Sequence, residues 1–293
     1  MDKPHTITGR TRIVGVIGAP VEHSRSPQMH NAALAKAGLD YIYVPFNVPP
    51  NAVAEAMNGF KALNVVGINV TLPHKQAVIP YLSSISREAE LIGAVNTLTF
   101  SDGKIHGENT DAPGFIRALE ETGAAVPVSK DVVVLGAGGS ARAIVVALVL
   151  AGIRSVIIAN RTTPKAVTLA EELSEKIYAP QDKIGQKTVL TGMGLNDTRL
   201  PDAVKNCALL VSTSSSSMDP SLPLLIDPGW LHPEIIVCDI VYTPPMTTLL
   251  TVAAEKQCHI IGGLGMLVHQ GAIAFERWTG VTPCLATMQQ ALL

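Results

Sequence analysis

The chain has 293 residues, 47% of them hydrophobic and 16% charged, and its 22 basic and 24 acidic side chains give a formal net charge of −2. Because a domain usually holds about 100–200 residues, this length favours two domains, and the apolar content excludes wholesale disorder. The near balance of charge argues against a protein that binds nucleic acid through a basic surface, so we expect no nucleic-acid partner.

In chain order, we predict strands at residues 12–17, 41–45, 65–70, 95–100, 131–135, 155–159, 209–212, 235–240 and 259–261. Helices are predicted at 28–37, 53–63, 139–151 and 165–176, and another helix should start near Asp111. This alternation indicates an α/β fold with parallel sheets covered by helices on both faces. The helix at 139–151 is apolar nearly all round, so we expect it to be deeply packed.

Neither a membrane span nor a signal peptide is predicted. The longest unbroken apolar run covers residues 143–153, whereas a membrane-spanning helix needs about 20 apolar residues. Residues 1–10 lack the apolar stretch of a signal peptide, so we expect a cytoplasmic protein with no membrane partner.

The cysteines and histidines show no spacing typical of a metal site. No two cysteines have CxxC spacing, and the eight histidines form no HExxH pair. We therefore expect no structural metal, and we expect buried, reduced thiols at all four cysteines, Cys207, Cys238, Cys258 and Cys284.

A glycine-rich turn joins the predicted strand at 131–135 to the predicted helix at 139–151. It reads Gly136-Ala137-Gly138-Gly139-Ser140-Ala141. Glycines permit a tight turn and let backbone N–H groups approach a pyrophosphate, while the helix N-terminus adds donors and a positive partial charge. Because a strand precedes this turn and a helix follows it, the pattern predicts a Rossmann-type dinucleotide-binding unit rather than an ordinary turn.

The residues after the next predicted strand indicate which dinucleotide binds. An NAD site usually carries an acidic residue there for the ribose 2′-hydroxyl, whereas this chain has Asn160-Arg161-Thr162. Arg161 offers a planar fork of donors for a 2′-phosphate, Asn160 and Thr162 offer hydrogen bonds, and Lys165 adds positive charge. We predict NADP as the cofactor, with a solvated loop arginine as the alternative interpretation.

Hydride transfer also needs a proton donor and polar groups that orient the substrate. Candidates at predicted strand ends and loops are Ser24, Ser26, Asn69, Thr71, Lys75, Asn96 and Asp111. None is persuasive alone, because a lysine after a proline turn is usually solvated and an aspartate before Ala-Pro-Gly is usually a helix cap.

Together these segments resemble the shikimate dehydrogenase family. The family elements GxPxxHSxSPxxHN, GxNVTxPxK and GAVNT are matched at residues 18–31, 67–75 and 93–97. The elements GxNTDxxG, GAGGxxRA and NRT are matched at 107–114, 136–143 and 160–162, and segments 239–242, 262–270 and 278–280 also fit. The matches follow the order of the family and extend over most of the chain.

This resemblance implies reversible, NADPH-linked reduction of 3-dehydroshikimate to shikimate, a step of chorismate and aromatic amino-acid biosynthesis. It makes Lys75 the catalytic acid/base and Asp111 the carboxylate that orients it. Hydride transfer places negative charge on the ketone oxygen, and an ammonium within hydrogen-bond reach stabilises that oxygen and can deliver its proton.

Further binding residues follow from the resemblance alone. The substrate carboxylate and ring hydroxyls would be held by Ser24, Ser26, Asn69, Thr71, Asn96, Tyr242 and Gln270. The cofactor would be contacted by Ser214, Met218 and Gly263, with Met218 near the nicotinamide or, equally, in a core. The chain departs from the family pattern at Ser212, where asparagine is usual, and at Ser217, where glycine is usual. Ser217 would lose backbone freedom if that position needs a positive φ.

The expected architecture is therefore α/β with two domains. Residues 1–111 and 263–293 would form a substrate-binding and catalytic domain with a mostly parallel sheet, and residues 112–262 a Rossmann-type NADP-binding domain, with the active site in the cleft between them. A quinate/shikimate dehydrogenase that also uses NAD and a non-catalytic NADP-binding regulator stay open as alternatives. The chain would be a monomer or a homodimer.

Overall fold

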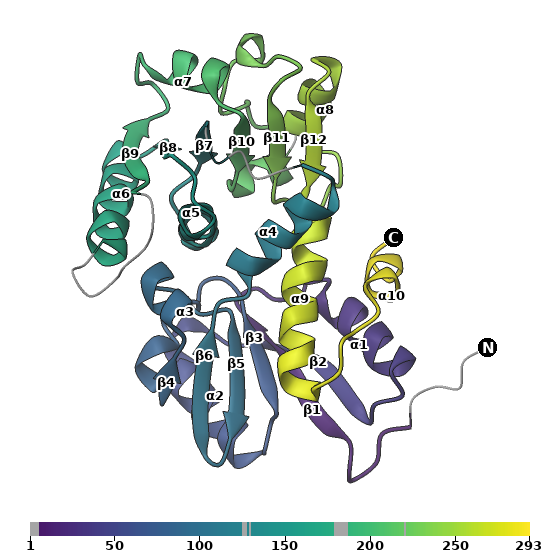
Figure 1. The fold of residues 1–293 in the computed structure, drawn as a ribbon. Helices are drawn as coiled ribbons and strands as arrows, with labels where there is room; N and C mark the ends of the chain where they lie inside the picture. Colours follow the sequence, from purple (N-terminus) through teal and green to yellow (C-terminus); the bar gives the residue numbers. More distant parts are fainter. Residues whose placement is uncertain (1–5, 125–127, 129, 179–186, 220) are drawn as a thin grey trace. The chain divides into compact units, whose positions relative to one another are not determined.

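The computed structural model describes residues 6–124, 128, 130–178, 187–219 and 221–293. The chain divides into two compact α/β units (Figure 1). The first unit comprises Met1–Thr110 and Val268–Leu293, and the second comprises Asp111–Leu267. The α/β class predicted from the sequence is confirmed.

The first unit is built on a six-stranded mixed sheet in the order β2-β1-β3-β5-β6-β4. Its strands are β1 (Arg12–Gly18), β2 (Tyr41–Asn47), β3 (Gly67–Val70), β4 (Ser84–Ile85), β5 (Thr97–Ser101) and β6 (Lys104–Glu108). Strands β2, β1 and β3 run parallel, β5 runs antiparallel to β3 and β6, and β4 pairs parallel to β6. The sheet is thus mostly parallel, as expected, but it contains a hairpin.

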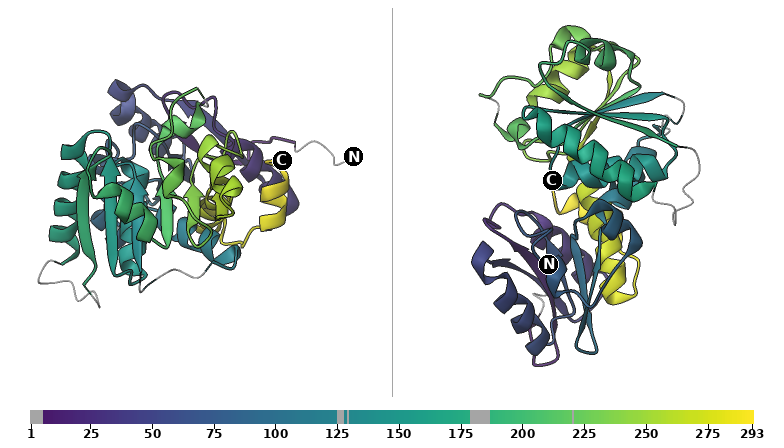
Figure 2. Two further views of the ribbon diagram at one scale, coloured as in Figure 1. Left: turned by 90° about the horizontal axis from the view of Figure 1, so that it is seen from above. Right: turned by 90° about the vertical axis from the view of Figure 1, so that its left-hand side faces the viewer.

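Helices cover both faces of this sheet. Its helices are α1 (Ser26–Lys36), α2 (Val53–Ala62), α3 (Arg87–Ile92), α10 (Leu285–Gln290) and, from Val268 onward, α9 (Gly263–Thr279). Helix α2 lies on one face, and α1 and α9 lie on the other (Figures 1 and 2). Helix α9 is fixed to the sheet by Trp278, whose Nε1–H donates to the Leu98 carbonyl at 3.0 Å.

The second unit contains a six-stranded, all-parallel sheet in the order β12-β11-β10-β7-β8-β9. Its strands are β7 (Asp131–Leu135), β8 (Ser155–Asn160), β9 (Val189–Gly194), β10 (Leu209–Ser212), β11 (Ile236–Asp239) and β12 (His259–Gly262). The chain starts in the middle at β7, winds outward to β9, and then crosses back to β10. The order therefore reverses between β7 and β10, and ligands of such sheets bind beyond the strand ends at this switch point.

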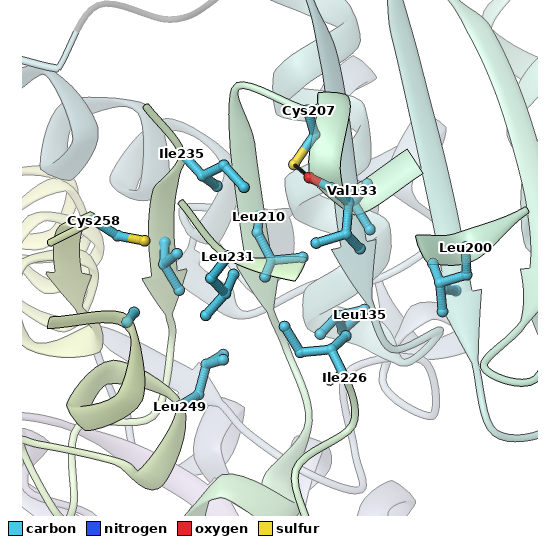
Figure 3. Close-up of a cluster of buried hydrophobic side chains, with 14 of the residues drawn as sticks. Val133, Leu135, Leu200, Cys207, Leu210, Ile226, Leu231, Ile235, Leu249 and Cys258 are labelled. Atoms are coloured by element: carbon cyan, nitrogen blue, oxygen red, sulfur yellow. Dashed lines mark hydrogen bonds between the residues drawn. The ribbon is translucent and has the colours of Figure 1, made fainter. Parts of the chain in front are cut away.

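The helices of the second unit are α4 (Asp111–Glu121), α5 (Gly139–Leu150), α6 (Thr163–Ile177), α7 (Leu200–Asn206) and α8 (Thr248–Glu255). Figures 1 and 2 show α5 and α6 on one face of the sheet and α7 and α8 on the other. Alternate residues of β7 and β10, such as Val133, Leu135 and Leu210, pack against the α7 and α8 side (Figure 3). Every residue of α5 from Ala143 to Val149 is buried, so the prediction of a deeply packed helix is confirmed.

The structure also differs from the sequence predictions at several points. Strands β4, β6 and β9 were not predicted, and the predicted strands at 65–70 and 95–100 begin two residues too early. The four cysteines are free thiols, but Cys284 is exposed, so the expectation that it is buried is wrong. Among the described residues, no helix has the length and apolar character needed to cross a membrane.

Candidate active site

In the first unit, a buried hydrogen-bond network joins several predicted substrate-binding residues. Ser26 opens α1, is buried, and lies near the Tyr43 hydroxyl. The Tyr43 hydroxyl donates to Oδ1 of Asn69 at 2.8 Å. Burial raises the pKa of Tyr43 well above its ordinary value, so Tyr43 acts here as a neutral donor. Ser24 is half-buried, and its Oγ accepts from the Ser26 backbone N–H at 3.3 Å.

The network continues through the two asparagines. Nδ2 of Asn69 donates to the Asn96 carbonyl and to Oγ1 of Thr97, both at 3.2 Å. Asn96 binds Thr110 through both ends of its amide: its Nδ2 donates to the Thr110 hydroxyl at 3.0 Å, and its Oδ1 accepts the Thr110 backbone N–H at 2.7 Å. Asn69 and Asn96 are therefore engaged by protein groups, and they hold their neighbours in place.

Tyr43, Thr97 and Thr110 belong to this network but were not predicted as site residues. Thr110 directly precedes the predicted partner Asp111, which is a local signal that could have indicated it. Thr97 is the last residue of the GAVNT element at 93–97, which could have indicated it, whereas Tyr43 lies within β2 and resembles an ordinary strand residue, so no short-range signal marks it.

The loop after β3 carries Thr71 and Lys75, and backbone hydrogen bonds fix both ends. Thr71 N–H donates to the Ile17 carbonyl at 2.9 Å, and the Lys75 carbonyl accepts the Val95 N–H at 2.8 Å. Between them, Nε2 of the buried His74 lies 2.6 Å from the Val48 carbonyl. Lys75 itself is half-buried. The lysine thus stands on a backbone held on both sides.

The loop after β3 packs closely against Gly18, and only glycine leaves enough space at this position. A Cβ there would lie 2.6 Å from Cγ2 of Thr71, which is closer than real side chains approach. The remaining first-unit candidate, Gln270, is half-buried on α9.

Asp111 is the first residue of α4 and is only 7% exposed. It is the first residue of the second unit, whereas Lys75 belongs to the first. The hydrogen bonds of Thr110 to Asn96 fix the residue immediately before it. In the second unit Tyr242 follows β11 and is half-buried.

The glycine-rich turn lies at the switch point of the second sheet. Gly136 follows β7 with a φ of 116°, and an added Cβ would clash with Oγ1 of Thr213, the residue after β10. Gly138 caps α5 without a side chain, and the first helical bond runs from Arg142 N–H to the Gly138 carbonyl. The N–H groups of Gly139, Ser140 and Ala141 therefore lie outside the helix's own ladder and point toward the sheet's carboxyl edge, which fits a pyrophosphate.

The end of β8 is basic. Asn160 is the last strand residue, and its Nδ2 donates to the Thr162 carbonyl at 3.1 Å, which shapes the turn into α6. Arg161 and Thr162 in that turn and Lys165 in α6 are exposed. With no carboxylate in this turn and two exposed cations near it, the site suits a phosphate better than a bare ribose hydroxyl.

The loop after β10 tests two predictions, the position of Met218 and the effect of serine at position 217. Met218 is 53% exposed, so the alternative that it fills a core is wrong. Ser217 lies within the 3-10 turn Ser215–Met218, capped by the Ser214 hydroxyl, and is not among the described residues with positive φ. Serine in place of glycine therefore causes no backbone strain there. Gly263 is buried against the Ile240 carbonyl, where a Cβ would clash, so packing explains this glycine.

These features define a class of protein. A chain that combines a doubly wound sheet with a glycine turn at its switch point and a separate α/β unit with a buried polar network has the architecture of a two-unit nicotinamide dinucleotide-dependent dehydrogenase. The described residues contain no group of three or more His, Cys, Asp or Glu side chains that could hold a metal ion.

Comparison with known proteins identifies the family. Residues 16–98 match the family model of the shikimate dehydrogenase substrate binding domain, residues 121–189 that of shikimate / quinate 5-dehydrogenase, and residues 263–293 that of the shikimate 5'-dehydrogenase C-terminal domain. The shikimate dehydrogenase (NADP(+)) of Methanopyrus kandleri is 44% identical over 290 residues, which cover 98% of this chain and 97% of the relative.

Solved structures of shikimate dehydrogenases are also similar to this chain. A shikimate dehydrogenase in complex with NADP+ is 40% identical, with a TM-score of 0.89 over 98% of this chain and 96% of the other. The shikimate 5-dehydrogenase of Listeria monocytogenes, in complex with shikimate and NAD, is 38% identical, with a TM-score of 0.87 over 98% of each chain. The chain belongs to the shikimate dehydrogenase family.

Proposed function

We propose that the chain catalyses the reversible, NADPH-dependent reduction of 3-dehydroshikimate to shikimate. It is an oxidoreductase of the shikimate pathway that acts on a CH–OH group and uses NADP. The observation that carries the cofactor assignment is the end of β8, where Arg161 and Lys165 are exposed and the turn holds no carboxylate.

Lys75 is the proposed acid/base. NADPH, when bound, supplies a hydride to the carbonyl carbon of the substrate. As the carbonyl electrons move to oxygen, the Lys75 ammonium stabilises the developing alkoxide and donates its proton to it. In the reverse direction neutral Lys75 accepts the proton of the hydroxyl. Asp111 orients the lysine and binds a ring hydroxyl, so the reaction needs residues of both units.

The first unit is proposed to hold the substrate. Ser24 and Ser26 bind the carboxylate through neutral donors, and Asn69, Thr71, Asn96 and Gln270 bind ring hydroxyls. Asn69 and Asn96 belong to one hydrogen-bond network, so these two side chains are held at fixed positions before the substrate arrives. Tyr242 of the second unit contributes beside the carboxylate. We assign the substrate-binding role to residues 1–111 and 263–293, which add Asp111 and residues 263–267 of the second unit to the first unit.

Residues 112–262 are proposed to bind NADP. The turn from Gly136 to Ala141 receives the pyrophosphate at the N-terminus of α5, and Asn160, Arg161, Thr162 and Lys165 bind the 2′-phosphate. Ser214, Met218 and Gly263 complete the nicotinamide side. The exposure of Met218 supports this role, since an exposed thioether is available to pack on a ring.

We place the reaction in the cytoplasm, because three of the four cysteines are buried as free thiols and the reaction draws on a diffusible pool of NADPH. The enzyme is proposed to act as a monomer or a homodimer, with shikimate and NADP(H) as its small-molecule partners.

Use of NAD or quinate is the second candidate, because the Listeria monocytogenes relative is in complex with shikimate and NAD. The test is the initial rate of NAD(P)H formation, followed by absorbance, with shikimate or quinate and with NADP+ or NAD+. We expect the highest kcat/KM for shikimate with NADP+. A higher value for quinate or NAD+ would favour the second candidate, and dinucleotide binding without turnover of either acid would indicate a regulator.

A further inference from the structure

Tyr43 of β2 carries a buried hydroxyl to which the proposed function gives no role. Tyr43 is 1% exposed, and its O–H donates to Oδ1 of Asn69 on β3 at 2.8 Å. Strands β2 and β3 each pair with β1 and lie on opposite sides of it. The hydrogen bond therefore joins two strands that are not neighbours in the sheet.

The neighbours of Asn69 determine which end of its amide faces Tyr43. A backbone carbonyl only accepts, so the end of the amide that lies 3.2 Å from the Asn96 carbonyl is the Nδ2 group. The same group also donates to Oγ1 of Thr97 at 3.2 Å. The other end is Oδ1, which only accepts, so the Tyr43 hydroxyl is the donor of the bond between them.

These three hydrogen bonds determine what Asn69 can offer to a ligand. They use both hydrogens of Nδ2 and one of the two lone pairs of Oδ1. The second lone pair of Oδ1 can accept a hydrogen bond but cannot donate one. Asn69 in this orientation therefore suits a ligand hydroxyl, and it does not suit an ionised carboxylate, which has no hydrogen to donate.

Two neighbouring residues of α1, His30 and Asn31, hold Tyr43 in place. The His30 ring stacks on the Tyr43 ring, with 4.3 Å between centroids and 3° between planes. Strand β2 is at the edge of the sheet, and Asn31 pairs with the backbone of Tyr43 there. Its Nδ2 donates to the Tyr43 carbonyl and its Oδ1 accepts the Tyr43 N–H, both at 2.9 Å. The ring and the backbone of Tyr43 are thus both fixed.

We propose that Tyr43 is a positioning residue that sets the affinity for shikimate through Asn69. Its hydroxyl holds the amide in the orientation that presents the second lone pair of Oδ1 to a ring hydroxyl, and it does so before the substrate arrives. Without this donor, only the two longer bonds from Nδ2 hold the side chain. The inference rests on the proposed function in taking Asn69 as a residue that binds a ring hydroxyl.

The test measures the Kd for shikimate by isothermal titration calorimetry on the whole chain. Tyr43→Phe removes the hydroxyl and keeps the ring that stacks on His30, so the packing around it is retained. Loss of one buried hydrogen bond should raise the Kd about fivefold. In turnover, KM for shikimate should rise while kcat stays close to that of the parent chain, because Lys75 is untouched.

Tyr41→Phe is the matched control. It removes the hydroxyl of the other tyrosine of β2, which is also buried. That hydroxyl accepts from Arg12 and donates to the Trp278 carbonyl, and it has no hydrogen bond to Asn69. Its loss should leave the Kd for shikimate unchanged.

A double-mutant cycle separates positioning through Asn69 from a general loss of structure. Asn69→Ala removes the amide through which Tyr43 is proposed to act, so adding Tyr43→Phe to it should change the Kd by less than about twofold. The inference is refuted if Tyr43→Phe binds shikimate as tightly as Tyr41→Phe, or if Tyr43→Phe raises the Kd equally with and without Asn69. A parent chain that binds no shikimate would instead refute the proposed function, and this inference with it.

Discussion

At the scale of single residues, we expect Arg161 to determine the preference for NADP+ over NAD+. A guanidinium bound to a 2′-phosphate makes charge-assisted, bidentate hydrogen bonds that a 2′-hydroxyl cannot offer. Arg161→Ala should therefore weaken NADP+ binding about tenfold or more and leave NAD+ binding nearly unchanged, as measured by the two dissociation constants.

Arg154→Ala is the control for this change. Arg154 precedes β8, at the other end of the strand that leads to Arg161, and forms an exposed ion pair with Asp131 at 2.7 Å. Its removal should affect neither cofactor. Equal losses for NADP+ and NAD+ in Arg161→Ala would show that this arginine does not contact the 2′-phosphate.

Residue types and order in the sequence were enough to indicate the candidate residues, but not what each side chain touches. Asn69 and Asn96 were predicted as ligands of the substrate, and the structure adds that both hold neighbouring protein groups. That double use depends on Tyr43 and Thr110, which reach them through the pairing of strands and through loops. Hydrogen bonds between residues distant in the chain leave no local pattern to read.

At the scale of elements, α1, β2 and α9 meet around a buried histidine. His30 of α1 has no exposed surface, and its ring stacks on Tyr43 of β2 at 4.3 Å between centroids, with Trp278 of α9 at 5.7 Å. Neither ring nitrogen has a hydrogen-bond partner among the described residues. Burial lowers the pKa of His30 from 6.5 to about 3, so the folded chain keeps it neutral.

This lowered pKa predicts how stability depends on pH. The unfolded chain binds a proton near pH 6.5 and the folded chain does not, so the contribution of His30 is complete above that pH. It is lost as pH falls toward 3, by about 1.4 kcal/mol per pH unit. His30→Phe removes the titration, and its melting temperature should fall less steeply than that of the parent chain below pH 6.5.

His23→Gln, which removes a histidine from the surface, is the control and should follow the parent curve. If the curves of His30→Phe and the parent chain run parallel between pH 7 and about 4, His30 does not act as described.

Element prediction succeeded where apolar runs were continuous and failed where pairing was local or weakly patterned. Strands β7 and β10 were predicted with their observed bounds because buried parallel strands are uninterrupted apolar runs. Strand β6 was missed although Asp102 and Gly103, with φ of 51° and 69°, form the Asp-Gly turn of the β5–β6 hairpin. That dipeptide is a hairpin signal and could have revealed the strand. Strand β9 ends in Gly-Met-Gly, which carries little strand signal.

At the scale of the whole molecule, the chain crosses between its units at Thr110–Asp111 and again within α9. The proposed acid/base and its carboxylate lie on opposite sides of the first crossing, and Gln270 follows the second. Sequence order suggested this arrangement only through the family resemblance, because composition and periodicity do not reveal a domain that is interrupted and resumed.

The chemistry attributed to the two units together depends on Lys75. Lys75→Ala removes the ammonium that stabilises the alkoxide and exchanges its proton, a loss on the scale of general acid–base catalysis. It leaves the second unit, and therefore NADPH binding, unaltered. Lys104→Ala, an exposed lysine on β6 of the same unit, is the matched control and should keep the parent rate.

The most direct measurement is kcat for shikimate oxidation with NADP+, compared between the parent chain, Lys75→Ala and Lys104→Ala. We predict that Lys75→Ala lowers kcat about 100-fold or more while its Kd for NADPH stays close to that of the parent chain. A near-normal kcat in Lys75→Ala would contradict the proposed mechanism and remove this lysine from the reaction.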